Sequence, residues 1–290
     1  MFVLAQLSDL HLACRPRLSE LVSKRGLGFI NWQRKRKAIH RPEVLDAITR
    51  DLKAQSFDHI AVTGDLVNLS LPDEYARARQ WLQSLGKPTD VTAIPGNHDV
   101  YVHGGEQAPA EFWSDYMRGD DGLQRFPFIR RRGEVALIAL STGVPTAPFL
   151  ATGCLGVRQL SRLADALDQT RGLFRLVLIH HPPVSPLRRF LRRLTDAAAL
   201  RSVLSEKGAE LLIHGHDHRR SLIWLDGPQG AKIAAVGAPS ASAIAPHGGE
   251  DGAGYNLFRI ERAGGWHCET IARQRGADGA IGEIERRRLF

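Results

Sequence analysis

Two periodicities of apolar residues alternate along this chain. Apolar runs of about four to eight residues are typical of buried strands, and longer segments with apolar residues three and four positions apart are typical of helices packed on a core. The pattern predicts strands at 2–8, 58–63, 91–94, 134–141, 175–179 and 209–213, and helices at 42–55, 72–85 and 156–170. Short strands separated by glycine turns follow at 222–225, 231–236, 255–260 and 266–271. The alternation predicts a layered α/β protein.

Two segments interrupt this pattern with cations and large apolar side chains. Residues 15–41 form a basic connection longer than an ordinary loop, which indicates a lid or binding insert, or else an amphipathic helix packed on the core. Residues 187–207 have apolar residues at helical spacing opposite an arginine-rich face, as in helices at membrane surfaces. We expect a single domain, 1–275, and a Gly- and Arg-rich C-terminal tail, 276–290, that frays.

The composition is that of an ordinary globular protein. Of the 290 residues, 43% are hydrophobic and 24% are charged, and a chain of this length can bury a sizeable core. No apolar run approaches the roughly 20 residues that span a bilayer, and the N-terminus lacks the features of a signal peptide. We therefore expect a cytoplasmic protein. Cys14, Cys154 and Cys268 are far apart and odd in number, so we expect free thiols.

The formal net charge of +8 is concentrated in clusters at 24–25, 34–41, 130–132, 188–201 and 286–288. Such clusters suit a phosphate-bearing substrate, a nucleic acid or an anionic membrane surface, or they are solvated basic faces. No specific nucleic-acid contact is expected, because the cations do not interleave with aromatic residues along a recognisable groove.

Residues that commonly bind metals follow five of the predicted strands. They are Asp9 and His11, Asp65, Asn97 and His98, His180, and His216 and His218. Layered α/β proteins commonly hold ligands at the C-terminal edge of the sheet. The set combines oxygen donors with imidazoles and contains no thiolate, which suits Mn²⁺, Fe²⁺ or Fe³⁺, or Zn²⁺. The set is too large for one ion and suits two ions that share a bridging carboxylate.

The motif order Asp-x-His, Gly-Asp, Gly-Asn-His-Asp, His and Gly-His-x-His resembles that of calcineurin-like metallophosphoesterases, and within them the bacterial class III cyclic nucleotide phosphodiesterases. The match runs from Asp9 to His218. The resemblance implies an α/β fold with mixed sheets, a four-layer αββα sandwich, and a site with two divalent metal ions, Mn²⁺ foremost. It implies that Asp9, His11 and His218 hold one ion, that Asn97, His180 and His216 hold the other, and that Asp65 bridges them.

The resemblance also implies the reaction. Two ions that share a water lower its pKa and neutralise the phosphate oxygens, so that a metal-bridged hydroxide attacks the phosphorus. Asp65 and His98 would be the catalytic residues. His98 would not be a ligand; with Asn97 it would contact the phosphate, and it would assist the leaving oxygen. Position 68 is acidic in several relatives and is asparagine here, which can orient His98 but cannot stabilise its protonated form.

The remaining polar residues near the motifs have structural interpretations. We expect Asp99 to hold the backbone by hydrogen bonds, and His181 and His214 to support the ligands or pack beside them. We expect His40 and His59 to be unrelated to the site.

The motifs leave the substrate open. A cyclic nucleotide or a related small phosphodiester is the first expectation. The two basic and apolar inserts suit instead a lipid-linked pyrophosphate such as UDP-2,3-diacylglucosamine, cleaved by a protein bound peripherally to the inner face of a membrane. A nuclease and a non-catalytic metal-binding scaffold are less favoured, and the sequence does not indicate the oligomeric state.

Overall fold

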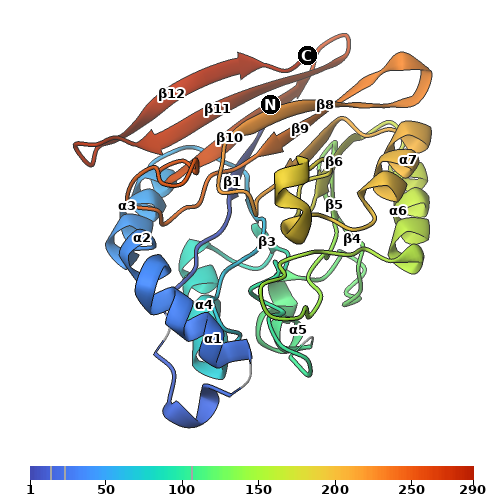
Figure 1. Ribbon diagram of the computed structural model, residues 1–290. Coiled ribbons are helices and arrows are strands. Elements are labelled where there is room, and N and C mark those ends of the chain that lie inside the picture. The colour runs from blue at the N-terminus through green and yellow to red at the C-terminus, as the bar shows by residue number, and fades with distance from the viewer. Residues whose placement is uncertain (14, 23, 106) are drawn as a thin grey trace.

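Two mixed sheets pack face to face in the computed structural model, which describes residues 1–13, 15–22, 24–105 and 107–290 (Figure 1). The first sheet contains, in spatial order, β12 (Ile281–Arg288), β11 (Trp266–Arg275), β10 (Gly254–Arg262), β1 (Phe2–Leu7), β2 (His59–Val62) and β3 (Val91–Ala93). The second contains β4 (Phe128–Arg132), β5 (Val135–Ala139), β6 (Phe174–Leu178), β7 (Leu211–His214), β9 (Lys232–Gly237) and β8 (Ser221–Asp226). In the first sheet the parallel strands β1, β2 and β3 form one side and antiparallel strands the other, and in the second sheet antiparallel edge strands flank four parallel strands.

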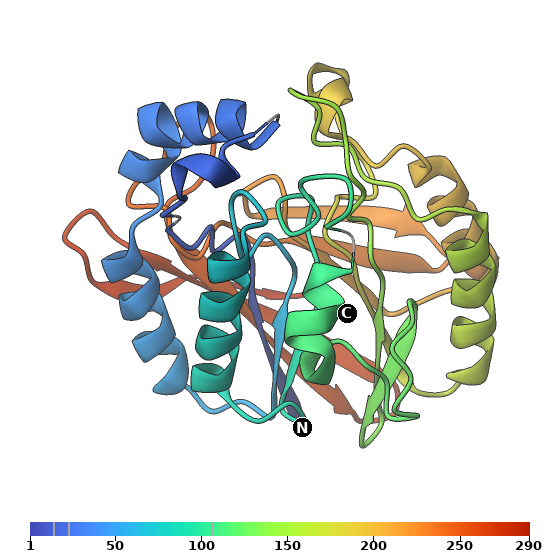
Figure 2. The same ribbon diagram turned by 90° about the horizontal axis from the view of Figure 1, so that it is seen from below.

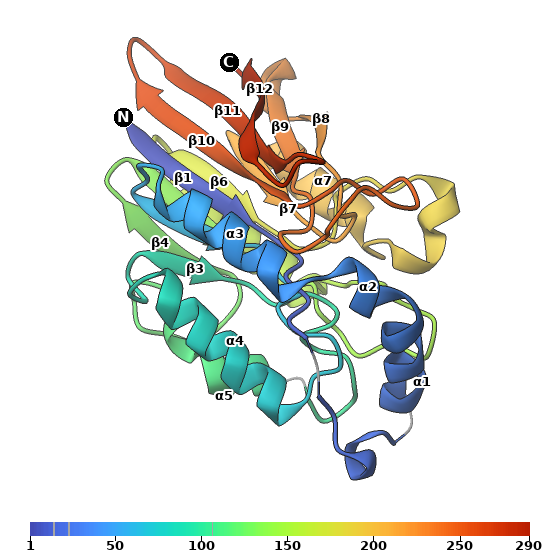
Figure 3. The ribbon, with the colours of Figure 1, turned by 90° about the vertical axis from the view of Figure 1, so that its left-hand side faces the viewer.

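Helices cover the outer face of each sheet (Figures 2 and 3). The helices α3 (Pro42–Lys53), α4 (Pro72–Leu85) and the shorter α5 (Ala108–Trp113) lie beside the first sheet, and α6 (Val157–Gln169) and α7 (Ala197–Lys207) lie on the second. The helices α3 and α4 begin with proline, whose fixed φ suits the first helical turn. Among the described residues, no helix is both long enough and apolar enough to cross a membrane. The predicted four-layer αββα sandwich is confirmed.

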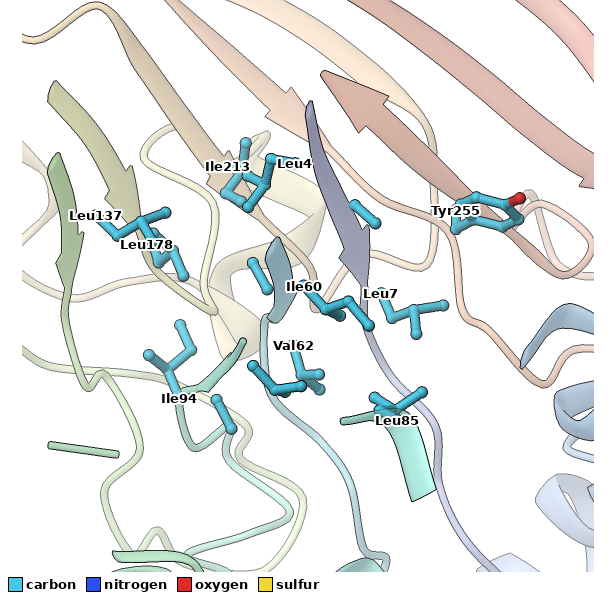
Figure 4. Packing of buried hydrophobic residues seen from close by; sticks show 14 of the residues in the cluster. Leu4, Leu7, Ile60, Val62, Leu85, Ile94, Leu137, Leu178, Ile213 and Tyr255 are labelled. Atoms are coloured by element: carbon cyan, nitrogen blue, oxygen red, sulfur yellow. The ribbon is translucent and has the colours of Figure 1, made fainter. Parts of the chain in front are cut away.

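The two sheets share one apolar core. Leu4, Ile60 and Val62 of the first sheet belong to the same buried cluster as Leu137 and Leu178 of the second (Figure 4). A separate cluster fills the space between the second sheet and the helices α6 and α7. Both sheets are thus held rigidly, and their strand ends form a fixed platform for the loops.

The C-terminal segment differs from the expectation. The predicted fraying tail, 276–290, contains β12, which pairs antiparallel with β11. Seven of its eight residues are exposed, so it lacks the apolar signal of a buried strand. Ion pairs hold it instead, including one between Arg286 and Glu269 across the two strands at 2.8 Å. The basic strand β4 was missed for a similar reason.

The insert 15–41 is largely helical. It contains η1 (Leu18–Glu20), α1 (Lys24–Asn31), a π-helical turn, η2 (Trp32–Arg36), and α2 (Lys37–Ile39). Trp32 is buried against Leu69 and Leu71, and Phe29 stacks on it with ring centroids 5.8 Å apart. The insert is therefore anchored on the domain by its aromatic residues.

The segment 187–207 is not one amphipathic helix. It divides into a 3₁₀-helix, η4 (Leu187–Arg192), and α7, and Asp196 precedes α7. The Asp196 carboxylate accepts hydrogen bonds from the backbone N–H groups of Leu155 and Gly156. This anchor separates the exposed η4 from the packed α7.

Two further short 3₁₀ turns, η3 (Ser114–Tyr116) and η5 (Pro228–Gly230), complete the elements. Cys154 and Cys268 are free thiols, as expected, and Cys14 lies outside the described residues.

Candidate metal centre

The strand-end residues singled out in the sequence converge on one buried site. Loops that follow the parallel strands β1, β2 and β3 meet loops that follow β6 and β7 at the carboxyl edges of the two sheets. All eight side chains are at most 9% exposed: Asp9, His11, Asp65, Asn97, His98, His180, His216 and His218.

The backbone at this site adopts an unusual conformation. Five of these residues have φ between +46° and +67°, a left-handed region that non-glycine residues seldom occupy. They are Asp9, His11, Asp65, His216 and His218. Each such residue costs on the order of 1 kcal/mol or more, and clusters of them mark sites where the surrounding structure fixes a functional geometry.

Asp99 stabilises the loops that contain Asp65 and Gly96. Its carboxylate accepts hydrogen bonds from the N–H groups of Asp65 (2.8 Å), Leu66 (2.9 Å), Val67 (3.0 Å) and Gly96 (2.8 Å). Asp99 therefore has the structural role that we expected. Gly96 is required beside it, because a Cβ atom there would lie 2.6 Å from the Asp65 nitrogen.

Three histidine rings each have one nitrogen held by a protein acceptor. His180 Nδ1 donates to the Thr63 carbonyl (2.7 Å), His216 Nε2 to the Arg192 carbonyl (2.8 Å). His218 Nδ1 donates to Glu250 Oε2 (2.8 Å). The opposite nitrogen of each ring points into the centre and is the one that is free to bind a metal ion when the ring is neutral. Such outer hydrogen bonds are how proteins fix the tautomer and orientation of metal-binding histidines.

The inward-facing atoms lie close together around Asp65. Its Oδ2 atom is 3.4 Å from His180 Nε2 and 3.9 Å from His11 Nε2. On one side His180 Nε2 is 3.3 Å from His216 Nδ1. On the other side His11 Nε2 is 3.1 Å from His218 Nε2, which is 3.2 Å from Asp9 Oδ1. Asp65 thus stands between two groups of ligand atoms.

The electrostatics match a site built for cations. Burial alone would lower the pKa of His180 and of His218, but the Asp65 and Asp9 carboxylates, respectively, raise each to about 9. Burial would raise the pKa of Asp65, and the neighbouring His180 and His98 instead hold it below its usual range. Without metal, the centre draws protons to compensate its buried carboxylates.

The residues present fit two cations. Asp9 Oδ1 and Asn97 Oδ1 are buried oxygens with no hydrogen-bond partner among the described residues, which is costly unless something else, such as a cation, satisfies them. Compact groups of possible ligand atoms form around Asp65, one with His180 and His216 and one with His11 and His98. The oxygen and imidazole donor set suits a catalytic rather than a structural metal site.

His98 lies at the edge of this centre and is held in one tautomer. Its backbone N–H donates to Asp65 Oδ1 (2.7 Å), and its Nδ1–H donates to the Asn68 carbonyl (2.7 Å). Its Nε2 accepts a hydrogen bond from Arg36 Nη1 (2.6 Å). Burial, together with the Arg36 charge, lowers the pKa of His98 to about 3. The neutral ring faces outward, toward a cavity. The Asn68 amide does not orient His98, because it donates instead to the Leu12 carbonyl (2.6 Å).

The prediction that His40 is unrelated to the site is wrong. His40 is buried with its ring centroid 4.5 Å from that of His11 and 5.5 Å from that of His218. Its Nδ1 is 2.8 Å from Ser242 Oγ. No predicted strand ends at His40, so the pattern that identified the other histidines could not find it. Arg36 and Glu250 were missed for the same reason.

The other flanking histidines agree with their structural interpretations. His181 is held between Thr142 and the Ala151 carbonyl and packs on His216 with centroids 4.2 Å apart. His214 is buried beneath the loop. His59 lies at the amino end of β2, opposite to the end that carries the site.

A family model for calcineurin-like phosphoesterases matches residues 2–220. The chain belongs to this family. Its members are metal-dependent phosphoester hydrolases, and the chain is therefore one such hydrolase with candidate His and Asp metal-binding groups. A relative described as a "probable cyclic nucleotide phosphodiesterase", from Synechococcus sp., is 26% identical over 92% of this chain and 90% of its own length.

Solved structures with the same fold are more distant. The purple acid phosphatase of yellow lupin seeds superposes with a TM-score of 0.58 at 12% identity, over 97% of this chain. The sulfate thiohydrolase SoxB of Thermus thermophilus has a TM-score of 0.50 at 17% identity, over 99% of this chain. The chain spans 52% and 56% of these two proteins, so the likeness shows the phosphoesterase fold alone.

Proposed function

We propose that this phosphoesterase hydrolyses a phosphodiester, a cyclic nucleotide or a related small diester, with two divalent ions bound at the Asp65 centre. The convergence of histidine nitrogens and buried oxygens on Asp65 carries this proposal. The phosphodiesterase-like relative, which matches nearly the whole chain, supports the diester. Mn²⁺ is our first choice of metal for this donor set, with iron or Zn²⁺ as alternatives.

A cavity of about 310 Å³ beside the centre suits a small diester. Asn97 and His98 line it, together with Arg36. When bound, the metal ions supply a nucleophile at neutral pH and neutralise phosphate charge. Asn97 and the neutral His98 ring would position the ester, and Arg36 holds the His98 ring by donating to its Nε2 atom.

The test replaces the residue between the two ligand groups. Asp65→Ala should lower Mn²⁺-dependent hydrolysis of bis-(p-nitrophenyl) phosphate by at least about 10³-fold, because both groups of ligands lose their shared carboxylate. Asp46→Ala, on the exposed face of α3, is the matched control and should keep the wild-type rate. A near-wild-type rate in Asp65→Ala would sink the two-metal proposal.

The surface around the cavity favours a second candidate, a lipid-linked pyrophosphate. Large apolar side chains are exposed on three segments near the opening: Leu27 (47%), Phe149 (85%) and Leu187 (92%). These segments are joined by hydrogen bonds from Lys24 Nζ to Thr146 and from the Ala151 nitrogen to the Leu191 carbonyl. The helix α1 and the turn η4 protrude at the same end of the molecule (Figure 2). Exposed apolar groups amid cations suit an anionic lipid surface.

Vesicle sedimentation tests this second candidate. The triple variant Leu27→Ser, Phe149→Ser, Leu187→Ser should bind vesicles of 30 mol% phosphatidylglycerol at least about tenfold more weakly, because each buried apolar side chain contributes on the order of 1.5 kcal/mol. An unchanged far-ultraviolet circular dichroism spectrum and thermal unfolding midpoint are the folding control. Absence of vesicle binding by the wild type would exclude a peripheral position on the inner face of a membrane and leave the small diester.

A further inference from the structure

The cavity beside His98 is unusually rich in positive charge. Lys24 of α1, Arg36 of η2 and Arg192 of η4 line it. Among the residues that the structure describes, no carboxylate lines it. Its remaining lining is mostly apolar or aromatic, and includes Leu27 and Tyr101. A cavity of this kind suits a ligand with several negative charges and an organic group.

Two of these cations are in direct contact with no described carboxylate, although the Asp65 and Glu250 charges act on Arg36 from further away and raise its pKa against the effect of burial. Within the part of the chain that the structure describes, Lys24 and Arg36 form no ion pair with a carboxylate. Lys24 Nζ donates to Thr146 Oγ1 (2.9 Å) and lies 4.2 Å from the centre of the Tyr101 ring. Arg36 donates only to the neutral His98 ring among its described partners. Removing such cations from water without a partner is unfavourable. An anionic ligand that pairs with them would therefore offset a desolvation penalty that the unliganded protein already bears.

Arg192 is only weakly compensated. Its Nη1 lies 3.8 Å from Glu250 Oε1, whereas Glu250 Oε2 is 2.8 Å from His218 and 3.2 Å from His247. Glu250 is therefore shared by two histidines, and Arg192, whose Nη2 donates to the His216 carbonyl (3.2 Å), lines the cavity as a partly compensated cation.

Arg36 and Lys24 lie at different distances from the metal centre. Arg36 contacts His98, which lies at the metal centre. Tyr101 stacks on His98 with centroids 5.4 Å apart, and Lys24 lies over Tyr101. Lys24 has no described contact with His98 or Arg36 and meets them only through Tyr101, so we assign it to a different phosphate group from the one at the metal ions. A single phosphodiester has one negative charge. Once that charge is bound at the metal centre, Lys24 has no negative group of the substrate to pair with.

We propose that Lys24 and Arg36 form a second phosphate subsite, so that the preferred substrate has another phosphate next to the one that is cleaved. The inference rests on the proposed hydrolysis at the Asp65 centre and narrows its substrate to a pyrophosphate diester with an apolar or aromatic group. In that reaction the oxygen of water becomes bonded to the attacked phosphorus, and the bridging oxygen stays with the other phosphate. The two protons of water are shared between the two phosphomonoester products.

The test compares two substrates in each variant with Mn²⁺ present. p-Nitrophenyl thymidine 5′-monophosphate has one phosphate, and UDP-glucose has two. Lys24→Gln should lower kcat/KM for UDP-glucose at least about tenfold more than for the single diester, and Arg36→Gln should act in the same direction. Arg34→Gln, an exposed cation of the same insert, is the matched control and should change the ratio of the two kcat/KM values by less than about twofold.

The outcomes separate this inference from the proposed function. Equal losses on both substrates, or no loss on either, would overturn the second subsite while hydrolysis of the diester still supports the metal centre. If the wild type cleaves neither substrate, the proposed function fails, and calorimetric binding decides the subsite alone. UDP-glucose should then bind at least about tenfold more weakly to Lys24→Gln than to Arg34→Gln, and equal binding would overturn the subsite.

Discussion

Replacing Asp99 with asparagine should destabilise the whole domain, although the change only exchanges one carboxylate oxygen for an amide nitrogen. The Asp99 carboxylate is buried and accepts four backbone hydrogen bonds, two on each oxygen. Asparagine keeps one oxygen and places an N–H₂ group against the other two N–H donors. A buried hydrogen bond to a charged group contributes about 1.5–3 kcal/mol. Two lost bonds therefore cost about 3–6 kcal/mol, a large part of the 5–15 kcal/mol stability of a typical domain.

Urea unfolding of the metal-free protein measures this cost. Burial beside Asp65 raises the pKa of Asp99 to about 7, so the measurement belongs near pH 8, where the carboxylate is ionised. The midpoint for Asp99→Asn should fall with no change in the slope m. Asp46→Asn is the matched control on the exposed face of α3 and should stay within about 0.5 kcal/mol of wild type. An Asp99→Asn protein within about 1 kcal/mol of wild type would refute the role of these hydrogen bonds.

Two further changes probe other parts of the molecule. Glu250→Gln should weaken Mn²⁺ binding about 10- to 100-fold, because the charge-assisted acceptor that orients His218 is lost; unchanged affinity in a Mn²⁺ titration would show that His218 needs no such support. Burial lowers the pKa of His59 to about 3, so the unfolded chain takes up this proton first. The stability that neutral His59 provides is complete above about pH 6.5 and is lost as the pH falls toward 3, with a slope of up to about 1.4 kcal/mol per pH unit. His59→Leu should remove that slope from the pH dependence of the unfolding free energy, and parallel curves for the two proteins would contradict the assignment.

Local sequence patterns predicted the inner part of the fold well. The helix α4 follows its apolar spacing and begins at Pro72, and the strand β2 ends just before Asp65. Each of these elements packs against the core, so apolar residues recur in its sequence with the period of a helix or fill it as in a buried strand. The edge strands β4 and β12 are mostly polar or basic, and their pairing depends on neighbours that the local pattern does not specify.

The candidate site divides in the same way. That the candidate ligand residues lie together was predictable, because each follows an apolar strand and shares a sheet edge with the others. His40 reaches the site through contacts with Ser242, 202 positions away, and Glu250 reaches it through His218, 32 positions away. Arg36 contacts His98 across 62 positions. Only the tertiary structure brings these side chains together.

Different segments of the chain supply the candidate metal centre and the cavity beside it, which separates the choice of substrate from the hydrolysis step. The side chains around Asp65 come from loops at the ends of the central strands, whose positions are fixed by the shared core of the two sheets. The cations that face the cavity come instead from the insert 15–41 and from η4, which lie outside that core. Changes in these segments can alter which ester reaches the centre without moving Asp65. For this reason, the substitutions that change substrate preference should lie in α1, η2 and η4, and the substitutions that abolish hydrolysis of every ester should lie at the strand ends.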